Sequence, residues 1–330
     1  MYEIIDGVEL FIGIINSFKQ KKVNYNSPLE EIIIKSTKNN LAYVDNRLEA
    51  LEKYDFDFWN SIKKKFKNEK DFLSWTKTND IDERILYSKS EQFPDFIFKS
   101  RIKNNKLTCG SLLELKDSKG GSIASFNSTL PTKYKTLEEV DIINGNDLIT
   151  RIASIMDDKL SSFEDYYYFQ RRCFYLIRTH KDNKDRVKIS IVDGSFFETV
   201  SKEHLIYQMF LNIFRSHLEK NDIKIKPELL SEIEKSLSYI TDQTIIASSQ
   251  NIEESSIKPR LRIMAEVHSE GNPHSNHYPD ILENSINLII KLDNYKKEID
   301  KFISKNKTDI HVFNIKHKRN GEHKVFQFRF

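Results

Sequence analysis

Two carboxylates and a lysine stand at the ends of two neighbouring apolar segments. Asp95 follows Pro94 at the head of "PDFIFKSRI", and Glu114 and Lys116 close "LTCGSLLELK". Two carboxylates can hold a divalent cation such as Mg²⁺, which neutralises charge on a phosphodiester and keeps several water ligands. A lysine beside the attacking water can orient or deprotonate it and offset charge on the phosphate. These residue types predict metal-dependent hydrolysis of phosphodiesters.

The triplet Glu114-Leu115-Lys116 is one of six acid-x-Lys triplets in the chain, so the pattern alone carries little weight. Glu114 differs from the other acids because the apolar run "SLL" precedes it, where an unpaired charge is costly. In a strand, Glu114 and Lys116 point to one side and Leu115 to the other. The alternative is a surface hairpin whose ends are simply charged.

A β-hairpin is predicted to position these residues, because the Asn pair of "KNNK" suits a turn between the two segments. The first 90 residues predict helices, one of which begins where Ser27, Pro28 and Glu30 match a capping box. Further strands are predicted in "RRCFYLIRTH", "DRVKISIVDG", "DIHVFNIKHK" and "HKVFQFRF". Helices are predicted in "KDFLSWTKTN", "KEHLIYQMFLNIFRSHLEK", "KPELLSEIEKSLSYI" and "ILENSINLIIKLDNYKKEIDKFISK", and a helix start at Pro279-Asp280.

This order of elements predicts an α/β fold with a central mixed β-sheet flanked by helices and carrying helical additions. We divide the chain into three regions. Residues 1–90 form an N-terminal helical region that packs on the core, and residues 91–215 form the catalytic core. Residues 216–330 form a C-terminal α+β region, for which we expect DNA binding or dimerisation.

Pro94-Asp95, followed at hairpin distance by Glu114-Leu115-Lys116, resembles the motif of the PD-(D/E)XK nuclease superfamily, particularly its type II restriction endonucleases. The resemblance covers roughly residues 25–200. It implies a restriction-endonuclease-like core, in which helices flank a mixed sheet of four or five strands. It also implies Mg²⁺-dependent cleavage of double-stranded DNA that leaves 5′-phosphates, with Mn²⁺ as a substitute, and commonly a homodimer acting on a palindrome.

The resemblance further implies roles for individual residues. Asp95, Glu114 and Lys116 would be catalytic, and Asp95, Glu114 and the Leu115 carbonyl would bind the metal. In such enzymes an acidic residue of the first core helix often joins the metal site. We assign that place to Glu31, because Glu30 is the expected capping-box residue, and Glu49 is the reserve.

Recognition of DNA sequence is expected in the polar segment that directly follows the catalytic strand, "KDSKGGSIASFNSTLPTKYK". Its donors and acceptors for base edges and phosphates are Lys119, Ser122, Ser125, Asn127, Ser128 and Thr129. An ordinary polar surface loop is the alternative. Basic runs at 63–67, 258–262 and 316–319 are either phosphate-contacting faces or solvated surface.

Composition restricts the class of protein. The 330 residues, 38% hydrophobic and 12% aromatic, predict a globular chain with one large domain or two smaller ones. The net charge of +3 does not by itself demand a nucleic-acid partner. No apolar run approaches the ~20 residues that span a bilayer, and no signal peptide is evident, so we expect a cytoplasmic protein without membrane contact. Cys109 and Cys173 are too few for a disulfide framework or a Cys-based zinc site.

The sequence therefore predicts a type II restriction endonuclease that makes sequence-specific double-strand cuts. The nearest alternative is a repair or mobile-element nuclease with the same core. A non-catalytic DNA-binding protein is the alternative from another class. The histidines of "HSEGNPHSNHYPD" match no helical metal-binding spacing and predict a polar loop.

Overall fold

A computed structural model of the chain describes part of its length. The described residues are 2–37, 41–43, 69–79, 93–98, 111–118, 130–136, 138–140, 170–180, 186–197, 202–240, 244, 248, 273–292, 299–300, 303–304 and 309–330. The chain divides into two compact units. The first comprises residues 1–126, 131–198 and 266–330, and the second comprises residues 127–130 and 199–265.

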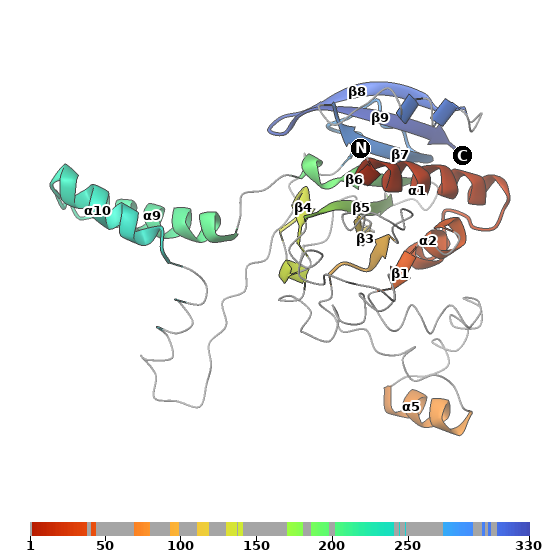
Figure 1. Ribbon diagram of the computed structural model, residues 1–330, viewed down its shortest axis with the longest axis horizontal. Coiled ribbons are helices and arrows are strands. Elements are labelled where there is room, and N and C mark those ends of the chain that lie inside the picture. The colour runs from red at the N-terminus through yellow and green to blue at the C-terminus, as the bar shows by residue number, and fades with distance from the viewer. Residues whose placement is uncertain are drawn as a thin grey trace, which may run out of the picture. The chain divides into compact units, whose positions relative to one another are not determined.

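In the described part of the first unit, nine strands form one mixed β-sheet (Figure 1). Its order is β1-β2-β3-β5-β6-β7-β9-β8, and β4 pairs with β5 off this path. The strands are β1 (Leu41–Tyr43), β2 (Phe96–Phe98), β3 (Leu112–Ser118), β4 (Tyr134–Lys135), β5 (Arg171–His180), β6 (Val187–Asp193), β7 (Ser285–Lys291), β8 (His311–His317) and β9 (Gly321–Arg329). The β3–β5 and β6–β7 pairs are parallel and the others antiparallel. The predicted α/β class with a mixed sheet is confirmed.

Helices α1 (Tyr2–Lys19) and α2 (Leu29–Thr37) pack on one face of the sheet (Figure 1). Their fully buried side chains, such as Phe11 and Ile33, join Leu113 and Phe174 of the strands in one apolar core. Gly13 permits a close approach of the two helices, because a Cβ there would lie 2.4 Å from the Ser36 carbonyl oxygen. This packing fixes α2 beside the strands that carry the candidate site.

The opposite face of the sheet is also buried, and a row of polar side chains crosses it. The strand registers place Ser190, Asn287 and Gln327 in one row across β6, β7 and β9. Asn287 Nδ2 donates to Ser190 Oγ at 3.4 Å, and Gln327 Nε2 donates to Asn287 Oδ1 at 3.0 Å. Because buried polar groups are stable only when hydrogen-bonded, this row favours one register of the central strands.

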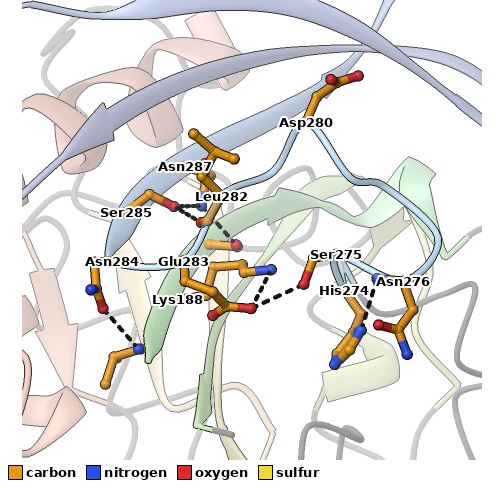
Figure 2. Close-up of polar contacts among 12 residues, drawn as sticks. Lys188, His274, Ser275, Asn276, Asp280, Leu282, Glu283, Asn284, Ser285 and Asn287 are labelled. Atoms are coloured by element: carbon orange, nitrogen blue, oxygen red, sulfur yellow. Dashed lines mark hydrogen bonds and ion pairs between the residues drawn. The ribbon is translucent and has the colours of Figure 1, made fainter. Parts of the chain in front are cut away.

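The segment 273–284 lies against this polar face (Figure 2). Lys188 Nζ, on β6, lies 3.5 Å from Glu283 Oε1, which also accepts a hydrogen bond from Ser275 Oγ at 3.0 Å. Ser285 Oγ donates to the Leu282 carbonyl at 2.6 Å. These contacts hold the segment 273–284, which contains His274 and His277, against the sheet.

The second unit contains a pair of helices, α9 (Lys202–Lys220) and α10 (Pro227–Leu237). Arg215 and Glu234 join them by an ion pair at 2.7 Å. Helix α5 (Glu69–Thr78) belongs to the first unit. Within the described stretches, no helix combines the length and apolar character needed to cross a membrane.

Several predicted elements are confirmed. The structure contains the predicted helices α5, α9 and α10, and the predicted strands β5, β6, β8 and β9. The predicted hairpin strands β2 and β3 pair antiparallel, and β8 pairs antiparallel with β9.

Two predictions of helix differ from the structure. The first part of the run predicted as a helix from Ile281 is β7, because its consecutive apolar residues Leu288–Ile290 are fully buried in the middle of the sheet, whereas residues 299–300 and 303–304 of the same run are helical. Pro279-Asp280 precedes turns and bends instead of a helix. The helix predicted to begin at Ser27 is present as α2, which ends at Thr37 before β1.

The compact units also differ from the three regions predicted from the sequence. Residues 266–330 belong to the unit that contains β2 and β3, because β7 and β9 extend the same sheet. The sheet is accordingly larger than the four or five strands that the resemblance implies.

Candidate functional site

The register of β2 on β3 brings the two predicted carboxylates together. Phe96 pairs with Leu113 in this antiparallel ladder, so one further step places Asp95 opposite Glu114. Asp95 Oδ2 accepts a hydrogen bond from the Leu115 backbone N–H at 2.7 Å. The Asp95 side chain is therefore tied to β3 next to Glu114.

Glu114 and Lys116 share one face of β3, as the strand alternation predicts. Lys116 Nζ lies 2.6 Å from Glu114 Oε1, while Leu115 packs against the apolar core on the other face. Glu114 is only 7% exposed, and its Oε2 is buried with no hydrogen-bond donor in the described part of the chain. A surface hairpin with charged ends does not fit this burial.

Burial raises the pKa of the Asp95 carboxyl well above its usual range, and the charge of Glu114 raises it further. The Leu115 N–H and the Lys116 ammonium oppose this rise. Burial likewise raises the pKa of Glu114, against the lowering effect of Lys116. Two adjacent carboxylates that resist ionisation together are stabilised by a cation placed between them.

Glu30 is the α2 carboxylate whose charge reaches this pair, since it also raises the pKa of Asp95. The assignment of Glu31 assumed that Glu30 completes a capping box with Ser27. The Ser27 hydroxyl instead accepts a hydrogen bond from the Asn24 N–H at 3.2 Å. The reason for setting Glu30 aside is thereby removed, and the role of Glu31 as a ligand stays a prediction.

Arg178 on β5 connects the start of α2 to β3, a contact that the sequence analysis missed. Its guanidinium binds Asp117 in a bidentate manner at 3.0 and 2.5 Å. It also donates to the backbone carbonyls of Tyr25 at 3.0 Å and Ser27 at 2.5 Å, just before α2. Only the strand pairing reveals this role, because Arg178 is distant from all its partners in sequence.

The pKa of Asp117 is shifted in the opposite direction from those of its neighbours Asp95 and Glu114. Burial acts to raise the pKa of Asp117, but the hydrogen bonds and charge of Arg178 outweigh it and lower the pKa. His180 Nε2 lies 3.2 Å from Asp117 Oδ1 and adds to the lowering. Asp117 is therefore an ionised structural partner of Arg178, directly after Lys116.

Tyr175 is a second residue that the sequence analysis missed. It is the register partner of Glu114 in the β3–β5 ladder, and its hydroxyl accepts a hydrogen bond from the Thr132 N–H at 3.2 Å. Burial raises the pKa of Tyr175 well above its usual range. The phenol stays protonated beside Glu114 and ties the segment before β4 to the site.

Some predicted residues lie outside the described residues. These are Glu49, the basic runs 63–67 and 258–262, and the predicted recognition residues Lys119, Ser122, Ser125, Asn127, Ser128 and Thr129. The run 316–319 lies where β8 turns into β9. Across the part of the chain that the structure describes, no group of three or more His, Cys, Asp and Glu side chains is arranged to hold a metal ion.

Comparisons with known proteins returned no matching family model, curated protein or solved structure.

Proposed function

We propose that the chain is a metal-dependent endonuclease that hydrolyses phosphodiester bonds of double-stranded DNA, with Asp95, Glu114 and Lys116 as its catalytic residues. The observation that carries the proposal is the placement of the buried Glu114 carboxyl next to the half-buried Asp95 carboxyl, beside one lysine at the junction of β2 and β3. A stable core has no need of two adjacent carboxyls whose ionisation burial opposes, so their presence favours a function.

These residues fit a hard divalent cation. Both carboxyls resist ionisation together, and Glu114 Oε2 is buried without a donor in the described chain. Asp95, Glu114 and the Leu115 carbonyl would hold Mg²⁺ or Mn²⁺, with Glu31 or Glu30 of α2 as a further carboxylate. The bound cation would supply positive charge to the scissile phosphate and lower the pKa of a water.

Lys116 would act on the proton and the charge of the reaction. Its ammonium is anchored on Glu114 Oε1, which limits the positions that Nζ can occupy. Held there, Nζ would orient the attacking water and donate a hydrogen bond to a phosphate oxygen as negative charge develops on it.

The finer assignment is a type II restriction endonuclease that recognises a specific sequence, leaves 5′-phosphates and works as a homodimer in the cytoplasm. Its support is the resemblance of Pro94-Asp95 and Glu114-Leu115-Lys116 to the family motif. A repair or mobile-element nuclease would share the same site and differ in what it recognises.

Digestion of a defined plasmid tests the proposal. With Mg²⁺ or Mn²⁺ the parent protein should cut, whereas excess EDTA or Glu114→Gln should abolish cutting. Discrete fragments with 5′-phosphate ends support restriction, and a smear supports a less specific nuclease. Equal cutting by the parent and Glu114→Gln, or cutting in EDTA, would contradict the proposal. Light scattering at several protein concentrations tests the homodimer.

A further inference from the structure

Two further cationic side chains, those of Lys135 and Arg171, lie on the same face of the sheet as Glu114. Lys135 of β4 is the register partner of Arg171 of β5, so the two side chains project to the same face. Arg171, Cys173 and Tyr175 alternate along β5 onto one face, and Tyr175 is the register partner of Glu114. Arg171 and Glu114 are thus about 13 Å apart along the strand direction, at roughly 3.3 Å per residue.

Lys135 also contacts the segment that carries Asp95. Its Nζ lies 5.8 Å from the centroid of the Phe93 ring, and Phe93 is buried two residues before Asp95. Tyr175 reinforces the link, since its hydroxyl binds the backbone of Thr132, three residues before Lys135. One corner of the sheet therefore holds both the carboxylate pair and Lys135.

The ammonium of Lys135 has no carboxylate partner among the described residues, although Lys135 is only 8% exposed. The acids of this corner are engaged elsewhere: Asp193 pairs with Arg172, and Glu139 accepts hydrogen bonds from the Thr136 N–H and hydroxyl. The Phe93 ring attracts a cation but carries no net charge. A mostly buried ammonium without a carboxylate partner is costly unless an anion binds it.

We propose that Lys135 binds a backbone phosphate of the DNA substrate a few nucleotides from the bond that is cut. The inference rests on the proposed nuclease function and adds a substrate subsite to it. A phosphate fits because its oxygens accept charge-assisted hydrogen bonds from an ammonium. Such a contact would position the strand across Asp95 and Glu114 without reading its sequence.

The test measures binding of a fluorescein-labelled DNA duplex in Ca²⁺ by anisotropy, over a series of salt concentrations. Lys135→Met keeps an apolar side chain against Phe93 and removes the charge. It should weaken binding about three- to tenfold and reduce the slope of log K against log[salt] by about 0.9, the value for one phosphate contact. Lys135→Arg should retain the parental slope. Lys22→Met, which removes an exposed lysine just after α1, is the matched control and should leave the slope unchanged.

A Lys135→Met protein with the parental slope would overturn the subsite, as would an equal loss of slope in Lys22→Met. If Lys135→Met does not fold by circular dichroism, Lys135→Gln takes its place with the same expected slope. Cleavage by the parent in Mg²⁺ is scored separately. If Lys135→Met reduces the slope but the parent does not cleave DNA, the phosphate subsite stands and the nuclease function is refuted. If the parent cleaves DNA but Lys135→Met keeps the parental slope, the nuclease function stands and the subsite is refuted.

Discussion

Lys116 is held beside Glu114 by their ion pair. At this position we expect its charge to affect the cleavage rate much more than the DNA affinity. One positive charge among many phosphate contacts changes total DNA affinity modestly, whereas at the attacking water it acts on the transition state. Lys116→Ala should therefore lower the single-turnover cleavage rate by about 100-fold or more. Its DNA binding in Ca²⁺ should stay within about tenfold of the parent.

Ca²⁺ suits the binding measurement because it accepts the same oxygen ligands while it activates water poorly in such sites. Lys22→Ala, at an exposed position after α1, serves as the control for loss of one positive charge. Near-parental cleavage by Lys116→Ala would show that Lys116 is only the ion-pair partner of Glu114.

Asp95 should make the metal-free protein less stable as the pH rises. Its pKa is raised in the folded chain, first by burial and then by Glu114, so the folded state binds the proton more tightly than the unfolded state. The stability due to this proton is fully present below the ordinary aspartate pKa. It is lost as pH rises toward the raised, folded-state pKa.

Asp95→Asn should consequently be more stable than the parent at pH 8 in EDTA, by about 1 kcal/mol, because the amide carries no charge and still accepts the Leu115 N–H. The difference should shrink toward pH 4. Thermal unfolding over this pH range, with and without Mg²⁺, measures it. Asp117→Asn is the control, and it should change the stability in the opposite direction. The lowered pKa of Asp117 means that its ionised form stabilises the fold, so the amide should make the protein less stable. A parent that matches or exceeds the Asn variant at pH 8 would rule out the buried like-charge pair.

Residue types and spacing predicted that Asp95, Glu114 and Lys116 lie close together, because a carboxylate after an apolar strand is unusual on physical grounds alone, and the structure places them side by side. Their catalytic role stays a prediction. Residue types and spacing were insufficient for Glu30, Arg178 and Tyr175. Glu30 was set aside as a capping-box residue, whereas in the structure its charge acts on Asp95. Tyr175 becomes a neighbour of Glu114 only through the parallel pairing of β3 with β5. Such contacts depend on pairings that a linear pattern does not contain.

At the scale of elements, Arg178 is the contact that holds the start of α2 to β3. Arg178→Gln would leave two backbone carbonyls and Asp117 without their shared donor. We expect a loss of about 2–3 kcal/mol in the free energy of unfolding, because the guanidinium is buried and makes several charge-assisted hydrogen bonds. Urea denaturation measures the change, with the exposed Arg319→Gln as the control. Equal midpoints for the two variants would exclude the connection as a source of stability.

The elements themselves divide into those that local pattern decides and those that tertiary structure decides. α9 and α10 have helical periodicity and β8 pairs with β9 across a short turn, so local sequence was enough. β7 was mistaken for a helix because a strand buried on both faces has a continuous apolar run, without the alternation that marks an exposed strand. Neighbouring strands, and not the run itself, decide its conformation.

For the molecule as a whole, the sheet order joins distant parts of the chain. β7 and β9 belong to the sheet that contains β3, although more than 150 residues separate β7 from β3 in the sequence. The sequence analysis predicted the mixed α/β class correctly, since alternating helices and strands determine it. It placed residues 216–330 in a separate region, because no linear pattern shows that late strands complete an earlier sheet.

One sheet implies that the candidate site and the C-terminal strands unfold together. Phe326 of β9 is fully buried against the apolar core and is the register partner of Leu288 on β7. Phe326→Ala should lower the free energy of unfolding by about 3–5 kcal/mol, the usual cost of removing a buried phenyl ring. Val312→Ala, at a 41% exposed position of β8, is the control and should have a small effect.

Urea unfolding can be followed in parallel by circular dichroism and by DNA binding in Ca²⁺. Both signals should have the same midpoint in the parent, and Phe326→Ala should lower that midpoint equally in both. If Phe326→Ala shifted the circular dichroism signal and left the binding midpoint at its parental value, the C-terminal strands would be a domain independent of the site.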